Sequence, residues 1–159
     1  MIHQSDQLDD LIKLESVTIN NILEVLQSRF VQNEPYTMCG NICISVNPFQ
    51  WLNIYNKNYK GAHVFRILED VLRNTTDQTI IISGESGSGK TECVKICLKY
   101  FMDIEYVNNI DVMQKILSSG PILEYFGNAA TCRNKNSSRF GKFIKLQVHE
   151  NNNITAIYK

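Results

Sequence analysis

Apolar residues recur every three to four positions in four stretches of the chain, a spacing typical of amphipathic helices. A capping pair, Asn21 with Glu24, precedes the apolar positions of the first stretch, and Pro35 follows its end. The interval between the first and second stretches contains residues that are typical of a strand. The pattern therefore predicts helices over residues 22–30, 63–72, 90–101 and 112–118.

Four short segments have the composition of β-strands. Residues 42–46 are apolar except for Ser45 and are bounded by Gly40-Asn41 and Pro48, which predicts a buried strand. Residues 79–82 form a second β-branched run. Apolar and polar residues alternate over 144–149, and the triplet at 151–153 separates them from 154–158, so a C-terminal β-hairpin is predicted. Helices mixed with strands indicate an α/β fold.

Composition and charge suggest a single globular unit. The chain has 159 residues, of which 43% are hydrophobic, and only residues 1–8 are polar enough to be loose. Sixteen basic residues balance sixteen acidic ones without a run of like charge, so we expect no nucleic-acid partner and no membrane-binding segment. The absence of a long apolar stretch or signal peptide favours the cytoplasm.

The five cysteines are odd in number and lie among apolar residues, so we expect reduced and mostly buried thiols. The three histidines are scattered, which disfavours a structural zinc site around Cys93 and Cys97.

Residues 84–91 match the phosphate-binding pattern G-x-x-x-x-G-K-[ST], between an apolar run and a predicted helix. Glycines let the backbone N–H groups curl inward as a nest for phosphate. Lys90 would face the β- and γ-phosphates, and the hydroxyl of Thr91 would bind Mg²⁺. The alternative is a Gly/Ser-rich surface turn. The predicted nucleotide-binding residues of this P-loop are Gly84, Glu85, Ser86, Gly87, Ser88, Gly89, Lys90, Thr91 and Glu92.

Three other segments accompany the P-loop sequence GESGSGKTE (84–92): NPFQWLNIY (47–55), PILEYFGNA (121–129) and NKNSSRFGKF (134–143). Together they resemble the motor head of myosins, over nearly the whole chain from Asp9. The resemblance implies a partial motor domain over 9–159, with a P-loop NTPase-type core in which helices surround a mixed sheet. It implies Mg²⁺ and ATP as ligands, ATP hydrolysis to ADP and phosphate, and an actin filament as partner in the cytoskeleton.

The resemblance assigns roles to residues of two further loops. Asn47 and Tyr55 correspond to the loop that holds the adenine. Residues 134–143 correspond to switch I, a loop in which the resemblance gives each polar residue a role: Asn134 approaches the phosphates, Ser137 lies near the γ-phosphate and the attacking water, Ser138 adds a hydroxyl to Mg²⁺, and Arg139 pairs with a carboxylate of switch II. Lys90, Ser137 and Arg139 are thus the expected catalytic residues.

The chain also departs from the family pattern. It ends at Lys159, before the family's switch II, converter and lever, so we expect nucleotide binding without turnover from these residues alone. The connector at 56–62 is shortened, and Gly120 stands where the family favours Asn. The lack of a small β-barrel before the motor start favours an unconventional myosin.

Three functions remain open from the sequence. The first is the N-terminal part of an actin-based, ATP-driven motor. The second is a nucleotide-binding remnant without ATPase or motor activity. A small P-loop kinase is the third, and it is disfavoured because no acidic residue follows an apolar strand in the way that such enzymes require.

Overall fold

The computed structural model describes residues 8–56, 58–74, 76–103, 110–132, 134–148 and 154–157. The chain forms two compact units, Met1–Thr76 (unit 1) and Asp77–Lys159 (unit 2). The predicted loose N-terminus up to residue 7 and the predicted turn at 151–153 lie outside the described residues. Among the described residues, none of the helices has the length and apolarity needed to span a membrane.

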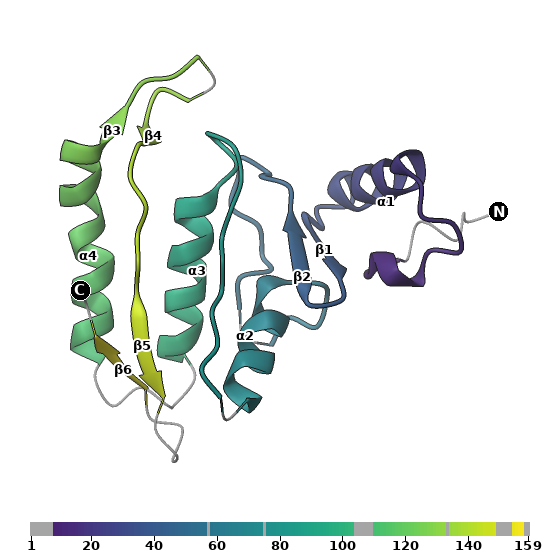
Figure 1. Ribbon diagram of the computed structural model, residues 1–159. Coiled ribbons are helices and arrows are strands. Elements are labelled where there is room, and N and C mark those ends of the chain that lie inside the picture. The colour runs from purple at the N-terminus through teal and green to yellow at the C-terminus, as the bar shows by residue number, and fades with distance from the viewer. Residues whose placement is uncertain are drawn as a thin grey trace. The chain divides into compact units, whose positions relative to one another are not determined.

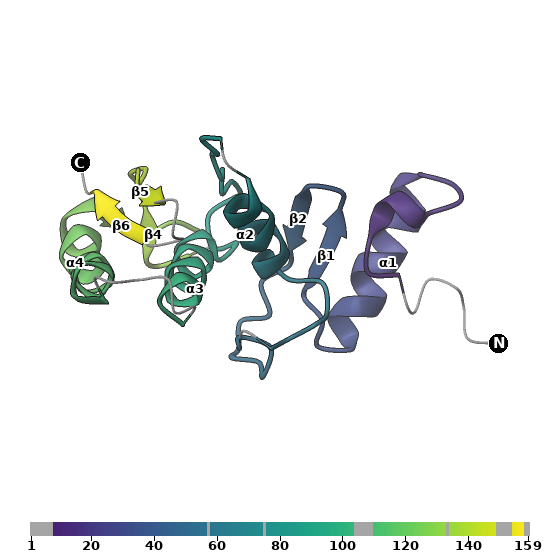
Figure 2. The same cartoon turned by 90° about the horizontal axis from the view of Figure 1, so that it is seen from below.

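Unit 1 is a β-hairpin placed between two helices (Figures 1 and 2). Its elements are the 3₁₀ turn η2 (Leu11–Lys13), helix α1 (Ile19–Val31), strands β1 (Tyr36–Cys39) and β2 (Ile42–Ser45), and helix α2 (Val64–Arg73). The strands pair antiparallel, with Cys39 opposite Ile42. This leaves a two-residue loop whose first residue, Gly40, has a φ of 58°, a position where hairpin turns favour glycine.

A buried arginine joins α1 to the hairpin. Arg29 is 3% exposed, and its Nε and Nη2 donate to the carbonyl of Tyr36 at 3.1 and 2.9 Å. Nη2 also pairs with the carboxylate of Glu34 at 3.0 Å, and Nη1 donates to the carbonyl of Leu8 at 3.3 Å. Because a buried charge is costly unless it is paired, these contacts explain why α1, β1 and the N-terminal segment pack at one point.

Unit 2 is built on two helices, α3 (Lys90–Asp103) and α4 (Ile110–Gly127), that lie side by side. The chain that runs from β4 (Ser137–Ser138) to β5 (Lys145–Val148) extends lengthwise along α3 and α4, on one side of the helix pair (Figures 1 and 2). β4 pairs with β3 (Asn128–Ala129), and β5 pairs with β6 (Ile154–Ile157), both antiparallel. The apolar core of this unit comes mainly from α3, through Ile96, Cys97, Leu98, Tyr100 and Phe101.

Most of the predicted elements are confirmed. The helices at 22–30, 63–72 and 90–101 correspond to α1, α2 and α3, and the C-terminal hairpin corresponds to β5 and β6. The predicted start of α1 was wrong, because the cap is Thr18, whose hydroxyl accepts a hydrogen bond from the N–H of Asn21 at 3.2 Å. The predicted strand at 42–46 exists as β2, but it is not buried: Ile42 is 63% exposed.

Two element predictions were wrong in unit 2. Residues 79–82 form no strand, and Ile81 is 83% exposed, because an extended segment becomes a strand only where a neighbour pairs with it. The last helix does not end near residue 118 but continues through Pro121 to Gly127. Proline removes one backbone donor, yet the turns on either side still carry the helix across it.

The described residues contain three two-stranded antiparallel sheets, so the structure combines helices with small antiparallel sheets. The expectation of mostly buried cysteines was wrong: Cys97 is buried, Cys132 is exposed, and the other three are half-buried.

Candidate functional site

The P-loop of unit 2 leads directly into α3. Gly87 and Gly89 have φ values of 85° and 90°, in the left-handed region that favours glycine. The N–H of Ser88 donates to the carbonyl of Glu85 at 3.2 Å, which closes a turn, and α3 begins at Lys90. The sequence thus places a tight turn at the N-terminus of a fourteen-residue helix, where backbone N–H groups and the helix dipole favour an anion.

Gly84 allows this loop to fold closely on itself. A Cβ atom at Gly84 would lie 2.5 Å from Oγ of Ser88, closer than any real contact permits. Oγ of Ser88 is buried and has no hydrogen-bond partner among the described residues. The backbone of Gly84 therefore lies close to the side chain of Ser88, and the hydroxyl of Ser88 is buried in the loop without a hydrogen-bond partner among the described residues.

Lys90 folds back over the loop. Its ammonium donates to the carbonyls of Gly84 and Glu85, both at 2.7 Å. Two bonds of this length hold the positive charge beside the loop rather than in solvent. The structure thus places the predicted phosphate-binding lysine at the P-loop.

The next residues of α3 point in different directions. Thr91 is half-buried and faces α4, whereas Glu92 is exposed and pairs with Lys95 at 2.7 Å. Further along, a hydrogen bond with Cys97 lowers the pKa of the Cys93 thiol. The first turn of the helix therefore presents a hydroxyl on its inner side and a carboxylate on its outer side.

The segment predicted as switch I is held by a short ladder and by its own side chains. Ser137 is buried and lies opposite Ala129, and Ser138 is half-buried opposite Asn128. Nδ2 of Asn128 donates to Oδ1 of Asn136 at 2.9 Å. These contacts position both serines that the sequence analysis selected.

Two other switch I residues are fixed through the backbone. The N–H of Asn136 donates to Oδ1 of Asn134 at 3.0 Å. Arg139 is exposed, and its N–H donates to the carbonyl of Gly127 at 2.9 Å. A Cβ atom at Gly127 would lie 2.4 Å from the ring of Phe140, so this glycine lets the end of α4 approach switch I.

A hydrogen bond joins the P-loop to switch I. Oγ of Ser86 donates to Oγ of Ser137 at 2.7 Å, across 51 residues of sequence. Oγ of Ser86 also lies 3.3 Å from Oγ1 of Thr131, just before switch I. A cluster of three hydroxyl groups, those of Ser86, Thr131 and Ser137, therefore joins the P-loop to the segment predicted as switch I.

The sequence matches a known protein family. The family model described as myosin head (motor domain) matches residues 8–158. This chain belongs to the myosin motor-domain family. The resemblance seen in the sequence motifs is thereby confirmed.

Individual myosins show how far the similarity extends. Myosin-14 of Arabidopsis thaliana is 40% identical over 94% of this chain and 11% of that protein. The high molecular weight form of myosin-1 of Acanthamoeba castellanii is 41% identical over 92% of this chain and 10% of that protein. Unconventional myosin-IXb of Rattus norvegicus is 41% identical over 89% of this chain and 8% of that protein. The chain spans about a tenth of the length of the curated relatives it matches.

In this myosin family member the predicted adenine loop belongs to unit 1. Oδ1 of Asn47 accepts a hydrogen bond from the N–H of Phe49 at 2.9 Å, and Phe49 takes a left-handed φ of 51°. The ring of Tyr55 packs against Trp51, with centroids 4.3 Å apart, and against His63 at 5.8 Å. Asn47 therefore shapes a turn, and Tyr55 is held by neighbouring rings.

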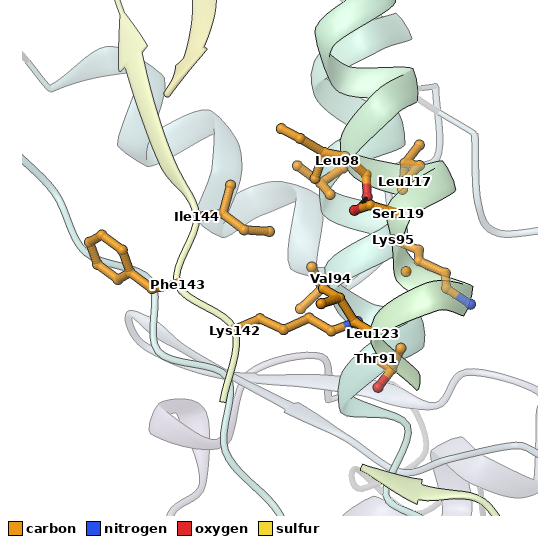
Figure 3. Close-up of a pocket in the computed structure, with 12 residues that line it drawn as sticks. Thr91, Val94, Lys95, Leu98, Leu117, Ser119, Leu123, Lys142, Phe143 and Ile144 are labelled. Carbon is orange, nitrogen blue, oxygen red and sulfur yellow. Dashed lines mark hydrogen bonds between the residues drawn. The ribbon is translucent and has the colours of Figure 1, made fainter. Parts of the chain in front are cut away.

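A small cavity of about 30 Å³ lies between α3, α4 and residues 142–144, which precede β5 (Figure 3). Thr91 lies at one end, and Val94, Leu98 and Leu123 form apolar walls. Gly120 also lines the cavity, and a Cβ atom there would have no neighbour within 4 Å apart from its adjacent residues and its own helix backbone. A space of this size holds about two water molecules, so it is a packing gap rather than a ligand site.

The sequence analysis missed Thr131, whose hydroxyl contacts both the P-loop and switch I. A signal was present in the spacing Thr131-x-x-Asn134, because a hydroxyl at position i often accepts from the N–H at i+3.

Proposed function

We propose that this chain binds Mg-ATP through the P-loop and switch I, as the nucleotide-binding part of an ATP-driven motor. The observation that carries the proposal is the 2.7 Å hydrogen bond between Ser86 and Ser137, which joins the two loops. Membership of the myosin motor-domain family supports it. The proposal includes a P-loop NTPase-type α/β core, supported by the order of extended segment, loop and helix in unit 2.

The residues present suit a triphosphate. The N-terminus of α3 and the positive-φ glycines of the loop present N–H groups, which are donors for phosphate oxygens. Lys90 can exchange two carbonyl acceptors for phosphate oxygens, which are stronger acceptors because they are charged. The buried hydroxyl of Ser88, which has no partner among the described residues, adds a donor inside the loop.

A magnesium ion would be held by the hydroxyls of Thr91 and Ser138, together with phosphate oxygens and water, which are the ligands that this ion prefers. When bound, Mg²⁺ neutralises part of the phosphate charge. We propose Asn134 as a further phosphate contact, and Asn47 and Tyr55 as the contacts to the adenine.

The chain's own residues would act mainly by positioning and by charge. Phosphoryl transfer needs an aligned attacking water and stabilisation of negative charge more than covalent chemistry. Ser137 is buried and its Oγ already accepts from Ser86, so its own proton is available to orient a water or a phosphate oxygen. Lys90 supplies the positive charge, and the exposed Arg139 is available to a carboxylate of switch II.

As part of a myosin, the protein would hydrolyse ATP to ADP and phosphate, bind the actin filament and work in the cytoplasmic actin cytoskeleton. The relatives named as myosins over this region support that assignment. The alternative is a nucleotide-binding remnant that has no ATPase or motor activity.

The proposal is tested by titrating the chain with a fluorescent ATP analogue in the presence of Mg²⁺. We expect saturable binding, and we expect Lys90→Ala to weaken it at least about a hundredfold, because charge-assisted hydrogen bonds to phosphate are lost. Lys99→Ala, which removes an exposed lysine from the same helix, is the matched control and should bind as the unaltered chain does. Equal binding by the Lys90→Ala and Lys99→Ala chains would contradict the assignment.

Phosphate release by a polypeptide that also contains switch II, measured with and without actin filaments, separates the two candidate functions. Actin-stimulated release indicates a motor ATPase. Binding without release favours the remnant.

A further inference from the structure

Thr131 lies three residues before Asn134 and holds it by both backbone polar groups. Oγ1 of Thr131 accepts from the N–H of Asn134 at 3.0 Å and can donate to its carbonyl, also at 3.0 Å. The N–H of Thr131 donates to the same carbonyl at 2.8 Å. The start of switch I is therefore closed by three hydrogen bonds between Thr131 and Asn134, two of which use the hydroxyl of Thr131.

The same hydroxyl reaches the P-loop. Oγ1 of Thr131 lies 3.3 Å from Oγ of Ser86, and Oγ of Ser86 lies 2.7 Å from Oγ of Ser137. Three hydroxyl groups thus follow one another from Thr131 through Ser86 to Ser137, and they link two segments that are 45 to 51 residues apart.

Each hydroxyl group has one proton to donate, and this limits how the three groups can be hydrogen-bonded to one another. Ser86 donates its proton to Ser137, so a hydrogen bond between Ser86 and Thr131 needs the proton of Thr131, which otherwise goes to the carbonyl of Asn134. Thr131 can turn its proton from the carbonyl of Asn134 to Ser86 without leaving that carbonyl unsatisfied, because the N–H of Thr131 still donates to it. The three hydroxyl groups then donate in one direction, from Thr131 to Ser86 and from Ser86 to Ser137. The proton of Ser137 is left to donate to a group outside this series.

We infer that Thr131 is a positioning residue that couples switch I to the P-loop, by fixing the backbone of Asn134 and by contacting the hydroxyl of Ser86. The inference rests on the proposed function, since Asn134 and Ser137 are the residues proposed to contact the phosphates. Thr131 itself is not placed in contact with nucleotide.

This role differs from the general stabilisation that any packed threonine provides. Valine has nearly the shape of threonine but has no hydroxyl, so Thr131→Val removes the three side-chain contacts and keeps the volume. Switch I would lose its attachment to the P-loop while the P-loop kept its own turn and Lys90. The effect should therefore fall on the part of the ligand that switch I contacts, the γ-phosphate, and should spare the rest.

The experiment compares Thr131→Val with the unaltered chain in two measurements. The first is amide hydrogen exchange without nucleotide. Exchange at Asn134 should become about five to ten times faster, the effect of losing one hydrogen bond of ordinary strength. The second is the ratio of the dissociation constants for Mg-ADP and Mg-ATP. Affinity for Mg-ATP should fall about tenfold, whereas that for Mg-ADP should change less than about twofold.

Two variants serve as controls. Thr131→Ser keeps the hydroxyl and should restore both values, and Thr79→Val makes the same chemical change at an exposed threonine of unit 2 and should alter neither. If Thr131→Val does not fold, Thr131→Ala replaces it in both measurements.

The outcomes separate this inference from the proposed function. Exchange at Asn134 that is unchanged in the variant overturns the inference, and so does an equal loss of Mg-ADP and Mg-ATP affinity. If the unaltered chain binds neither nucleotide, the proposed function fails, and the exchange rate at Asn134 alone decides whether Thr131 positions switch I.

Discussion

Acidification should destabilise unit 1 through His63, the residue that caps helix α2. His63 is 1% exposed and its Nδ1 accepts from the N–H of Phe65 at 3.3 Å. Three tyrosine rings and the ring of Phe65 surround it, with centroids 3.9 to 5.8 Å away. Burial lowers the pKa of His63 from 6.5 to about 4. A proton on Nδ1 would also break the cap, so the folded unit needs the neutral ring.

The sign and size of the effect follow from this difference. The unfolded chain binds the proton more tightly, so the contribution of His63 is complete above its ordinary pKa of 6.5 and is lost as the pH falls towards 4. A shift from 6.5 to about 4 corresponds to about 3 kcal/mol in total, of which about 2 kcal/mol is lost between pH 7 and pH 5.

Another titrating group of unit 1 acts at lower pH. Hydrogen bonding from Lys13 lowers the pKa of Asp9 below its ordinary 3.8, so that carboxylate stabilises the fold above this pH and loses its contribution below it. The window from pH 7 to pH 5 therefore isolates His63.

Denaturant unfolding followed by the fluorescence of Trp51 measures the effect. Trp51 is the only tryptophan of the chain and contacts Tyr55, so its signal reports on unit 1. His63→Asn is the control, because asparagine can also accept from the N–H of Phe65 but does not titrate. The unaltered chain should lose about 2 kcal/mol more than the variant between pH 7 and pH 5. Equal losses in the two proteins would refute the reasoning.

Two further substitutions test the packing. Gly127→Ala should lower the free energy of unfolding of unit 2 by about 1–3 kcal/mol, because the added methyl group meets the ring of Phe140, and Phe140→Leu in the same chain should recover part of the loss; an unchanged melting temperature would contradict this. Arg29→Met should cost about 3 kcal/mol in urea unfolding, since the carbonyl of Tyr36 loses a charged donor, and a loss below about 1 kcal/mol would show that the buried contacts contribute little.

Helices were the most predictable part of the fold, because their apolar spacing is a local property. α1, α2 and α3 were found in this way, and only the cap of α1 was misplaced. Strands depend on a partner that the local pattern does not reveal. Residues 79–82 are as β-branched as any strand but pair with nothing in the described residues, whereas Tyr36–Cys39, which has no such pattern, becomes β1 because β2 lies beside it.

The part of the candidate site that consists of motif residues was predictable from the sequence, because each of these residues has a recognisable chemical role by itself. The glycines, Lys90 and the two serines of switch I follow from their motifs, and the structure places Ser86 of the P-loop against Ser137. The spacing of Thr131 and Asn134 marks a local hydrogen bond, but the link from Thr131 to the P-loop was missed because it is a contact with Ser86, 45 residues away. The same holds for Gly127, whose lack of a side chain matters only where Phe140 packs against it.

The central claim is that the P-loop and switch I form one binding site for Mg-ATP. Amide chemical shifts of the isotopically labelled chain, recorded during a titration with Mg-ATP, test it most directly. We predict that the amides of residues 84–91 and of 134–138 shift together, with one dissociation constant, and that Lys90→Ala abolishes both sets of shifts. Shifts confined to one loop, two different dissociation constants, or the same titration in the Lys90→Ala chain would contradict the claim.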